Sequence, residues 1–172
     1  MLKNILITGL IVLLAFQSME QPIQTTIKTQ ALDMARSLIR NDFNAFSKYI
    51  HPAILEMAGG RENLKNNMDS ANSAMKQFGV QFKKILIGNP GAVISYQNQL
   101  QCVVPENTDM LTPMGEINLE TSLIAISTDQ GKNWYFIDTN VYKADKLKKV
   151  LPGLSPNLVI PPQKQPEITP NR

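Results

Sequence analysis

Apolar residues recur at three- and four-residue steps over residues 27–40, a spacing that places one apolar stripe on a helix. Asp42 is expected to accept free amide hydrogens at the start of a second short helix, which Pro52 ends or kinks. Gly59 and Gly60 predict a turn, and a third helix follows. The expected apolar face of this third helix consists of Leu64, Met68, Ala71, Met75 and Phe78.

The pattern changes from helical to alternating after Gly79, which predicts an antiparallel sheet of about four strands. Residues 105–114 hold two prolines and several turn formers, so a loop is expected there. Three helices that cover one face of a curved, meandering sheet make an α+β fold. The strands are expected at residues 80–87, 93–104, 115–127 and 133–138.

Near the start of the chain, one basic residue, Lys3, precedes a mainly apolar run over residues 5–16, which is typical of a secretory signal. The run is shorter than the roughly 20 residues of a membrane span. We therefore expect a signal peptide at residues 1–18 and an exported protein, either periplasmic or extracellular (secreted). No cysteine follows the run, so no lipid anchor is expected. The alternative is an uncleaved leader, which would be the chain's one contact with the membrane.

Residues 26–152 are expected to form one domain, which ends in a short basic helix at residues 144–151 with Leu147 turned inward. The tail at residues 153–172 is rich in proline, which predicts an extended, mobile segment without regular strand pairing. Its apolar triplet at residues 158–160 is expected to pack back onto the domain.

The 172 residues are 43% hydrophobic, which suffices for one core. The net charge of +3 comes without clustered basic residues, so no nucleic-acid partner is expected. One histidine and one cysteine cannot supply the usual nitrogen and sulfur ligands, so no metal site is expected. No phosphate-binding glycine loop is present and no cofactor is expected. Cys102 lies on the apolar side of an alternating segment, which favours burial.

Five short segments carry a likeness to a known family. They are residues 31–33, 41–43, 49–52, 59–62 and 131–138. In these segments and in its order of elements, the chain over residues 26–141 resembles the nuclear transport factor 2-like superfamily, a cystatin-like, cone-shaped fold. The resemblance implies a cavity at the open end of the cone, where the enzymes of the family place an aspartate base and a tyrosine or protonated acid.

Six residues are candidates for this cavity or its mouth, although none is matched to the catalytic aspartate of the family. They are Tyr49, His51, Tyr96, Asn98, Trp134 and Asp138. Each also has a purely structural interpretation: Trp134 as core, His51 at a helix end and Asp138 in a turn are examples. The methionines of the helices would suit a hydrophobic ligand if they lined the cavity.

Three functions then compete. The first is an exported, non-catalytic module that binds an apolar small ligand or a protein partner, because a pocket-forming fold comes without a recognisable catalytic set. The second is an isomerase, dehydratase or cyclase that uses His51, Tyr49 or Asp138. The third is an envelope assembly protein that forms a homodimer through its sheet and holds a partner with its tail.

Overall fold

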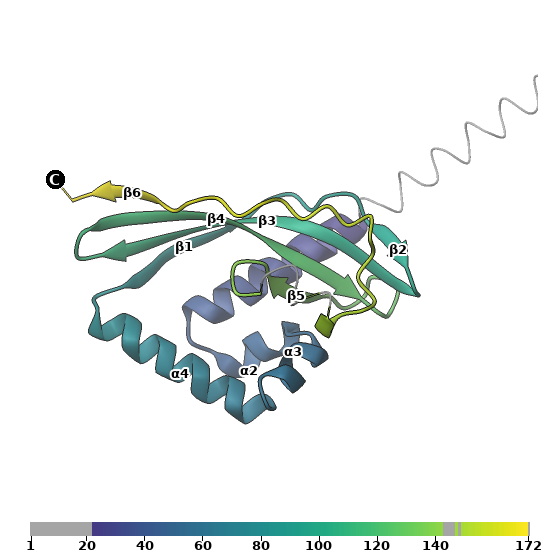
Figure 1. The fold of residues 1–172 in the computed structure, drawn as a ribbon, viewed down its shortest axis with the longest axis horizontal. Coiled ribbons are helices and arrows are strands. Elements are labelled where there is room, and N and C mark those ends of the chain that lie inside the picture. Colours follow the sequence, from purple (N-terminus) through teal and green to yellow (C-terminus); the bar gives the residue numbers. More distant parts are fainter. Residues whose placement is uncertain (1–21, 143–146, 148, 172) are drawn as a thin grey trace, which may run out of the picture.

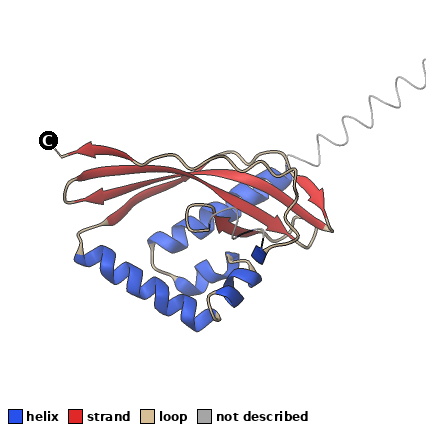
Figure 2. Ribbon diagram, in the orientation of Figure 1, coloured by secondary structure: helices blue, strands red, loops and turns tan. Residues whose placement is uncertain are grey.

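The computed structural model describes residues 22–142, 147 and 149–171 (Figure 1). The expected signal peptide lies outside these residues. Helices precede an antiparallel sheet, which confirms the predicted α+β fold, and Figure 2 shows them gathered on one side of the sheet. After a first helix at residues 22–39, the helices are α2 Phe43–Phe46, the 3-10 helix η1 Ser47–Tyr49, α3 Pro52–Met57 and α4 Arg61–Gln77. The strands are β1 Gln81–Ile87, β2 Ile94–Tyr96, β3 Gln99–Thr112, β4 Gly115–Ser127, β5 Tyr135–Asp138 and β6 Glu167–Pro170.

The first helix buries the stripe that its sequence predicts. Ile27 and Ala31 are fully buried, and Met34 and Ala35 are nearly so. Their spacing of three and four residues places them on one side of the helix, where they pack against the sheet. Burial of this stripe is what holds the helix on the sheet.

Polar caps define the short helices that follow. The Asp42 carboxylate accepts a hydrogen bond from the Ala45 amide at 3.0 Å, as the sequence predicts for an N-cap. Pro52 begins α3, whereas we expected it only to end or kink the preceding helix. The first turn of a helix needs no internal N–H donor, so proline fits there. His51 is the N-cap of α3, and its Nδ1 accepts a hydrogen bond from the Ala53 amide at 3.2 Å.

Glycines with positive φ flank α4 at both ends. Gly59 and Gly60, with φ of 79° and 99°, form the predicted turn before the helix, and Gly79, with φ of 68°, follows it. Such values are strained for residues with a side chain. The chain therefore turns sharply on either side of α4.

The helix α4 buries none of its side chains. Of its expected apolar face, Leu64, Met68 and Met75 are half-buried, whereas Ala71 is exposed and Phe78 is 69% exposed. In Figure 1, α4 runs below the sheet and is joined to β1 by the turn that follows the helix. The apolar face of α4 therefore looks toward the sheet without being sealed against it.

The sheet has six strands, with β1, β3, β4 and β5 in that order. All pairings are antiparallel, and β3 and β4 form its long central hairpin, from Thr112 opposite Gly115 to Leu100 opposite Ser127. The two strands beyond the expected four are β2, which pairs with β3, and β6, which pairs with β4. The first of these comes from a hairpin that we did not predict.

The prediction of one continuous strand over residues 93–104 is wrong. Gln97 and Asn98 have φ of 49° and 60°, so the chain reverses there, and Ile94 of β2 pairs with Gln101 of β3. Two consecutive positive φ values make the two-residue turn that matches the twist of a hairpin, and asparagine tolerates this conformation well.

The predicted loop over residues 105–114 is also wrong, because β3 continues through Pro105 as far as Thr112. The N–H and C=O groups of a strand residue point toward the same neighbouring strand. The Pro105 carbonyl accepts a hydrogen bond from Gly88 at 2.8 Å, just beyond the end of β1. Proline has no backbone N–H, and at Pro105 this missing donor faces the side of β1, where the strand pairing with β1 has already ended. The pairing of Pro105 with Ser122 of β4 is therefore kept.

The sheet is packed on both faces. On what we call the inner face, residues such as Val104, Ala125 and Phe136 form the main core with the first helix. On the opposite, outer face, a second core forms against the segment that follows β5. The buried members of the second core are Ile54, Ile124, Ile126, Ile137, Leu147 and Leu151.

The segment after β5 agrees in part with its prediction. Residues 147, 149 and 150 are helical and Leu147 is buried as expected, whereas residues 144–146 and 148 of the predicted helix lie outside the described part of the chain. Within the apolar triplet, Leu158 and Ile160 pack on the second core, but Val159 is 82% exposed.

The expectation of an unpaired tail is wrong. Gln101 of β3 is fully buried and holds the start of the tail, since it donates to the Gly153 carbonyl at 2.6 Å and accepts from the Ser155 amide at 2.9 Å. At its other end the tail forms β6, from Glu167 opposite Asn118 to Pro170 opposite Gly115. The prolines lie before and at the last residue of β6, so its interior keeps the N–H groups that pairing needs.

Candidate functional site

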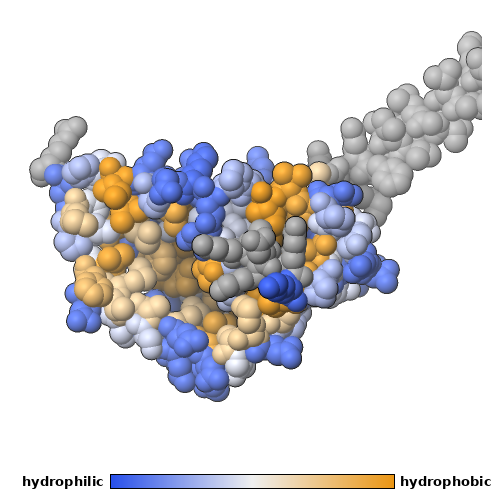
Figure 3. All heavy atoms as spheres, viewed as in Figure 1, coloured by the Kyte–Doolittle hydropathy of each residue, from blue (hydrophilic) through white to orange (hydrophobic). Residues whose placement is uncertain are grey.

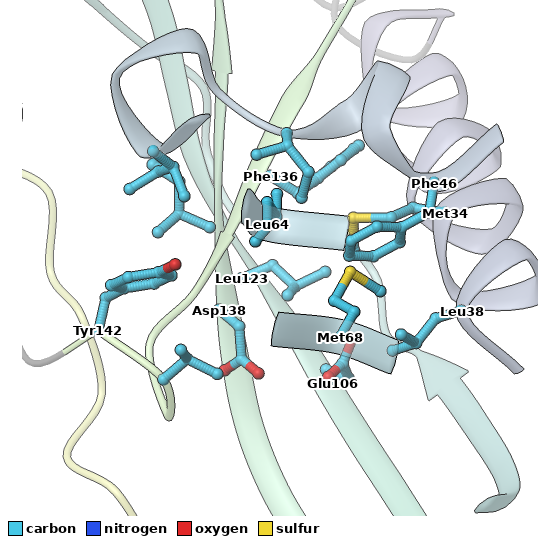
Figure 4. Close-up of a pocket in the computed structure, with 14 residues that line it drawn as sticks. Met34, Leu38, Phe46, Leu64, Met68, Glu106, Leu123, Phe136, Asp138 and Tyr142 are labelled. Atoms are coloured by element: carbon cyan, nitrogen blue, oxygen red, sulfur yellow. The ribbon is translucent and has the colours of Figure 1, made fainter. Parts of the chain in front are cut away.

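A cavity of about 230 Å³ lies between α4 and the inner face of the sheet (Figure 4). In Figure 3 the molecule is hollowed between the sheet and α4, and hydrophobic residues form the walls of the hollow. Three lining residues are polar, namely Glu106, Asp138 and Tyr142. The apolar lining consists of Met34, Leu38, Phe46, Ile50, Ile54, Leu64, Met68, Leu123, Phe136, Ile137 and Val141.

Strand register brings the two carboxyl groups to this cavity. Glu106 lies two residues beyond Val104 in β3, so both side chains share the inner face. Asp138, the last residue of β5, pairs with Leu123 of β4, which also lines the cavity. Figure 4 shows the Glu106 and Asp138 side chains entering the same space. The two carboxyl groups therefore reach the cavity from the strands on either side of β4.

The Glu106 carboxyl group has little polar support. The Thr121 hydroxyl, directly opposite on β4, donates to Glu106 Oε1 at a long 3.4 Å. Burial raises the pKa of Glu106 from 4.5 to about 7, and the nearby charge of Asp138 adds to the effect. Near neutral pH this group therefore exists in both protonation states.

The Asp138 carboxylate is better satisfied, because it accepts a hydrogen bond from the Asn140 amide at 2.7 Å. Burial raises the pKa of Asp138, although amide donors from Asn140 and Val141 act in the opposite direction. Asp138 thus closes the turn after β5, as its structural interpretation predicted, and also lines the cavity. Burial, with the charge of Asp138 as the second cause, raises the pKa of Tyr142 in the same cavity.

Two methionines line the cavity, Met34 from the first helix and Met68 from α4. Their side chains come from opposite walls and meet close to Phe46 (Figure 4). Methionine is flexible and polarisable, so it adapts to apolar ligands of different shape. Two other helical methionines lie elsewhere: Met57 is 44% exposed, and Met75, about two turns beyond Met68 on the same face of α4, lines a separate hollow with Ile39 and Phe82.

Of the six residues that the sequence singled out, Asp138 alone lines this cavity. Tyr49 packs on the main core, with its ring 6.3 Å from that of Phe136. His51 caps α3, and its ring meets Tyr135 edge-on at 5.6 Å. Burial lowers the pKa of His51, so its neutral form is favoured.

The other three candidates also lie away from the cavity. Trp134 is 1% exposed in the main core, and its indole N–H donates to the Gly131 carbonyl at 3.0 Å. Asn98 occupies the turn between β2 and β3. Tyr96 of β2 lines a separate hollow of about 440 Å³ formed by the tail. Tyr96 is the only titratable group among the described residues that line that hollow, and therefore the smaller cavity is the better candidate for a functional site.

Glu106 and Tyr142 are the site residues that sequence analysis missed. The predicted loop began at residue 105, so Glu106 was not counted as part of the strand. In the strand, Glu106 continues the every-second-residue pattern of Cys102 and Val104, which places its carboxyl group on the buried face. Tyr142 lies beyond the end of β5, in a segment where no periodicity indicates the direction of a side chain.

Cys102 is fully buried, as expected, and burial raises the pKa of its thiol to about 12. A thiol that stays protonated is a poor nucleophile. Within the described residues, no three histidine, cysteine or carboxylate side chains converge as a metal site. None of the helices in this same part of the chain is long and apolar enough to cross a membrane.

Comparison with known proteins gives no match: no family model, no curated protein and no solved structure is significantly similar to this chain.

Proposed function

We propose that this chain is an exported binding module whose cavity between α4 and the sheet holds an apolar small molecule. The observation that carries the proposal is the cavity itself, whose lining is apolar apart from one glutamate, one aspartate and one tyrosine. Small-molecule sites are concave and mostly apolar, with a few polar groups that orient the ligand.

The packing of α4 supports a ligand rather than an incompletely filled core. Both α4 residues that line the cavity, Leu64 and Met68, are half-buried, so the helix leaves apolar surface next to the space. Covering that surface removes apolar area from water, which is favourable at about 25 cal/mol per Å². A cavity of about 230 Å³ can hold the ring or alkyl portion of a ligand, with the remainder of a larger molecule toward solvent.

Export and kinship complete the proposal. The apolar leader at residues 1–18 is the basis for an exported, periplasmic or secreted protein. Helices on one face of an antiparallel sheet, with a cavity between them, are compatible with the resemblance to the nuclear transport factor 2-like superfamily. Membership of that superfamily is part of the proposal.

Titration with Nile red, a neutral apolar dye whose fluorescence rises in apolar surroundings, tests the binding function. We expect saturable binding to the wild type and roughly tenfold weaker binding to Met68→Gln, which puts an amide into the apolar wall. The matched control is Ala74→Gln, the same new side chain at an exposed position of α4. Absence of saturable binding, or equal weakening in both variants, would contradict the proposal.

A second candidate is an enzyme of the isomerase, dehydratase or cyclase type. One observation favours it: Glu106 and Asp138 enter the same cavity, and two carboxyl groups of different protonation can act as acid and base. The two functions differ in what happens to a bound ligand. Recovery of the ligand unchanged after prolonged incubation supports the binding module, and its conversion at a rate that falls in Glu106→Gln supports the enzyme.

A further inference from the structure

The charged residues among the described lining of the cavity are all acidic. Glu106 and Asp138 are acidic, Tyr142 is the remaining polar lining residue, and none of the described residues that line the space is a lysine, an arginine or a histidine. The walls contributed by the first helix, α3 and α4 are apolar, with Met34, Ile54 and Met68 as examples, so no titratable group faces Glu106 from these helices. Among the residues that the structure describes, a ligand in this cavity therefore meets two acids and no base.

Neither acid forms an ion pair with another residue that the structure describes. The ion pairs among the described residues lie elsewhere, and none includes Glu106 or Asp138. For comparison, Asp109 on the outer face of β3 has Lys84 at 3.1 Å. Asp138 receives backbone amide hydrogens, whereas Glu106 receives one long hydrogen bond from Thr121. Glu106 is thus the group with most hydrogen-bonding capacity left for a ligand.

Two carboxyl groups that repel each other in apolar surroundings favour a ligand that carries a positive charge. A positive charge between them would offset both the repulsion and the cost of burying charge, whereas an anion would increase both. The raised pKa of Glu106 has the same origin, since burial and the charge of Asp138 both disfavour its ionised form. A bound cation would lower that pKa again.

We propose that the ligand is a small apolar molecule with a protonated amine, which Glu106 and Asp138 bind while the methionine- and leucine-lined walls hold its apolar part. This proposal rests on the proposed binding function and adds the chemical class of the ligand. The amine donates hydrogen bonds to both carboxylates, and the alkyl or ring portion lies between α4 and the sheet.

Displacement of Nile red by three ligands that differ only in their head group tests the proposal. The ligands are octylamine, which is protonated over the pH range used, 1-octanol and octanoate. We expect octylammonium to displace the dye at a concentration about tenfold lower than octanol, and octanoate to be the weakest. Between pH 5.5 and 8.5 the preference for octylammonium over octanol should grow, because Glu106 ionises in this range.

Glu106→Gln removes the charge but keeps the size of the side chain, and it should reduce the preference for octylammonium over octanol and make it independent of pH, because Asp138 is the one proposed amine ligand that remains. The matched control is Glu56→Gln on the exposed surface of α3, which should keep the wild-type preference. Equal displacement by octanol and octylammonium in the wild type, or an amine preference in Glu106→Gln as large and as pH-dependent as in the wild type, would overturn the assignment of ligand class and leave the binding function standing. Failure of Nile red to bind the wild type would remove the binding function itself.

Discussion

Glu106 is a carboxyl group in a place that favours its neutral form. The strand register fixes it opposite Ile87 on one side and Thr121 on the other, so its side chain cannot leave the inner face without a shift of β3. Because burial raises its pKa to about 7, the folded protein binds a proton at this site more tightly than the unfolded chain does. The stability of the fold therefore depends on pH through this one residue.

The sign of that dependence is a prediction. The contribution of Glu106 to the free energy of unfolding should fall as pH rises from about 4.5, the ordinary pKa of glutamate, through about 7. Glu106→Gln should remove most of this loss: we expect it to be close to neutral at pH 5 and stabilising by up to about 3 kcal/mol at pH 8. Urea unfolding at the two pH values measures the difference. A variant that is less stable than the wild type at pH 8 would contradict the prediction.

At the scale of elements, β6 depends on one glycine. Gly115 has φ of 149°, and a Cβ atom there would lie 2.2 Å from the Thr169 carbonyl oxygen of β6. The strand approaches so closely because β4 offers no side chain at this point. The pairing of β6 therefore depends on a residue of β4 as much as on the sequence of the tail itself.

Gly115→Ala should release β6 and destabilise the protein by about 1–3 kcal/mol, because the substitution combines a backbone clash with an unfavourable φ. Limited proteolysis should then cut the chain within residues 161–171, with the domain left intact. The control is Met114→Ala, a change at the neighbouring residue, which is 77% exposed and should leave the tail protected. Equal protection of the tail in both variants would show that the β6 pairing does not need the glycine.

An element could be predicted when residues within the element itself determine its conformation, and was missed when distant residues determine it. The first helix, α4 and β4 follow local periodicity, and all three appear at the expected positions. Pro105 was misread because its effect depends on where β1 ends, a fact that is not local to β3. The tail was misread because its partners, Gln101 and Gly115, lie far away along the chain.

The candidate site was harder to predict than the fold. Asp138 was found because it ends a recognisable strand, but the cavity depends on how far α4 stands from the sheet. Nothing local to α4 sets that distance, since its sequence has the usual apolar face. Residues such as Trp134 and Tyr49 were site candidates because of their chemistry, but they pack in the main core.

At the scale of the whole molecule, stability is unevenly distributed. The first helix and the β3–β4 hairpin share a core with fully buried residues such as Ile27 and Cys102, whereas α4 has no buried side chain. Elements with few buried apolar contacts open at lower free energy than the core. The cavity is therefore bounded by the most stable part of the fold on one side and the least secured helix on the other.

Hydrogen exchange should reveal this difference. Amides of α4 should exchange faster than those of the central pairs of β3 and β4, such as Val103 and Ile124. A saturating ligand in the cavity should slow exchange in α4 more than in the strands, because it contacts Leu64 and Met68. Exchange of α4 at the rate of the central strands in the free protein would contradict this account.

The positive-φ glycines at both ends of α4 bear on selectivity. A receptor with rigid walls discriminates steeply between homologues that differ by one methylene group, since each extra carbon must find room in a filled space. Here one wall is a helix between two glycine turns, and displacing it disturbs little buried surface. Affinity should therefore climb gradually along a homologous series, without a sharp upper limit on chain length.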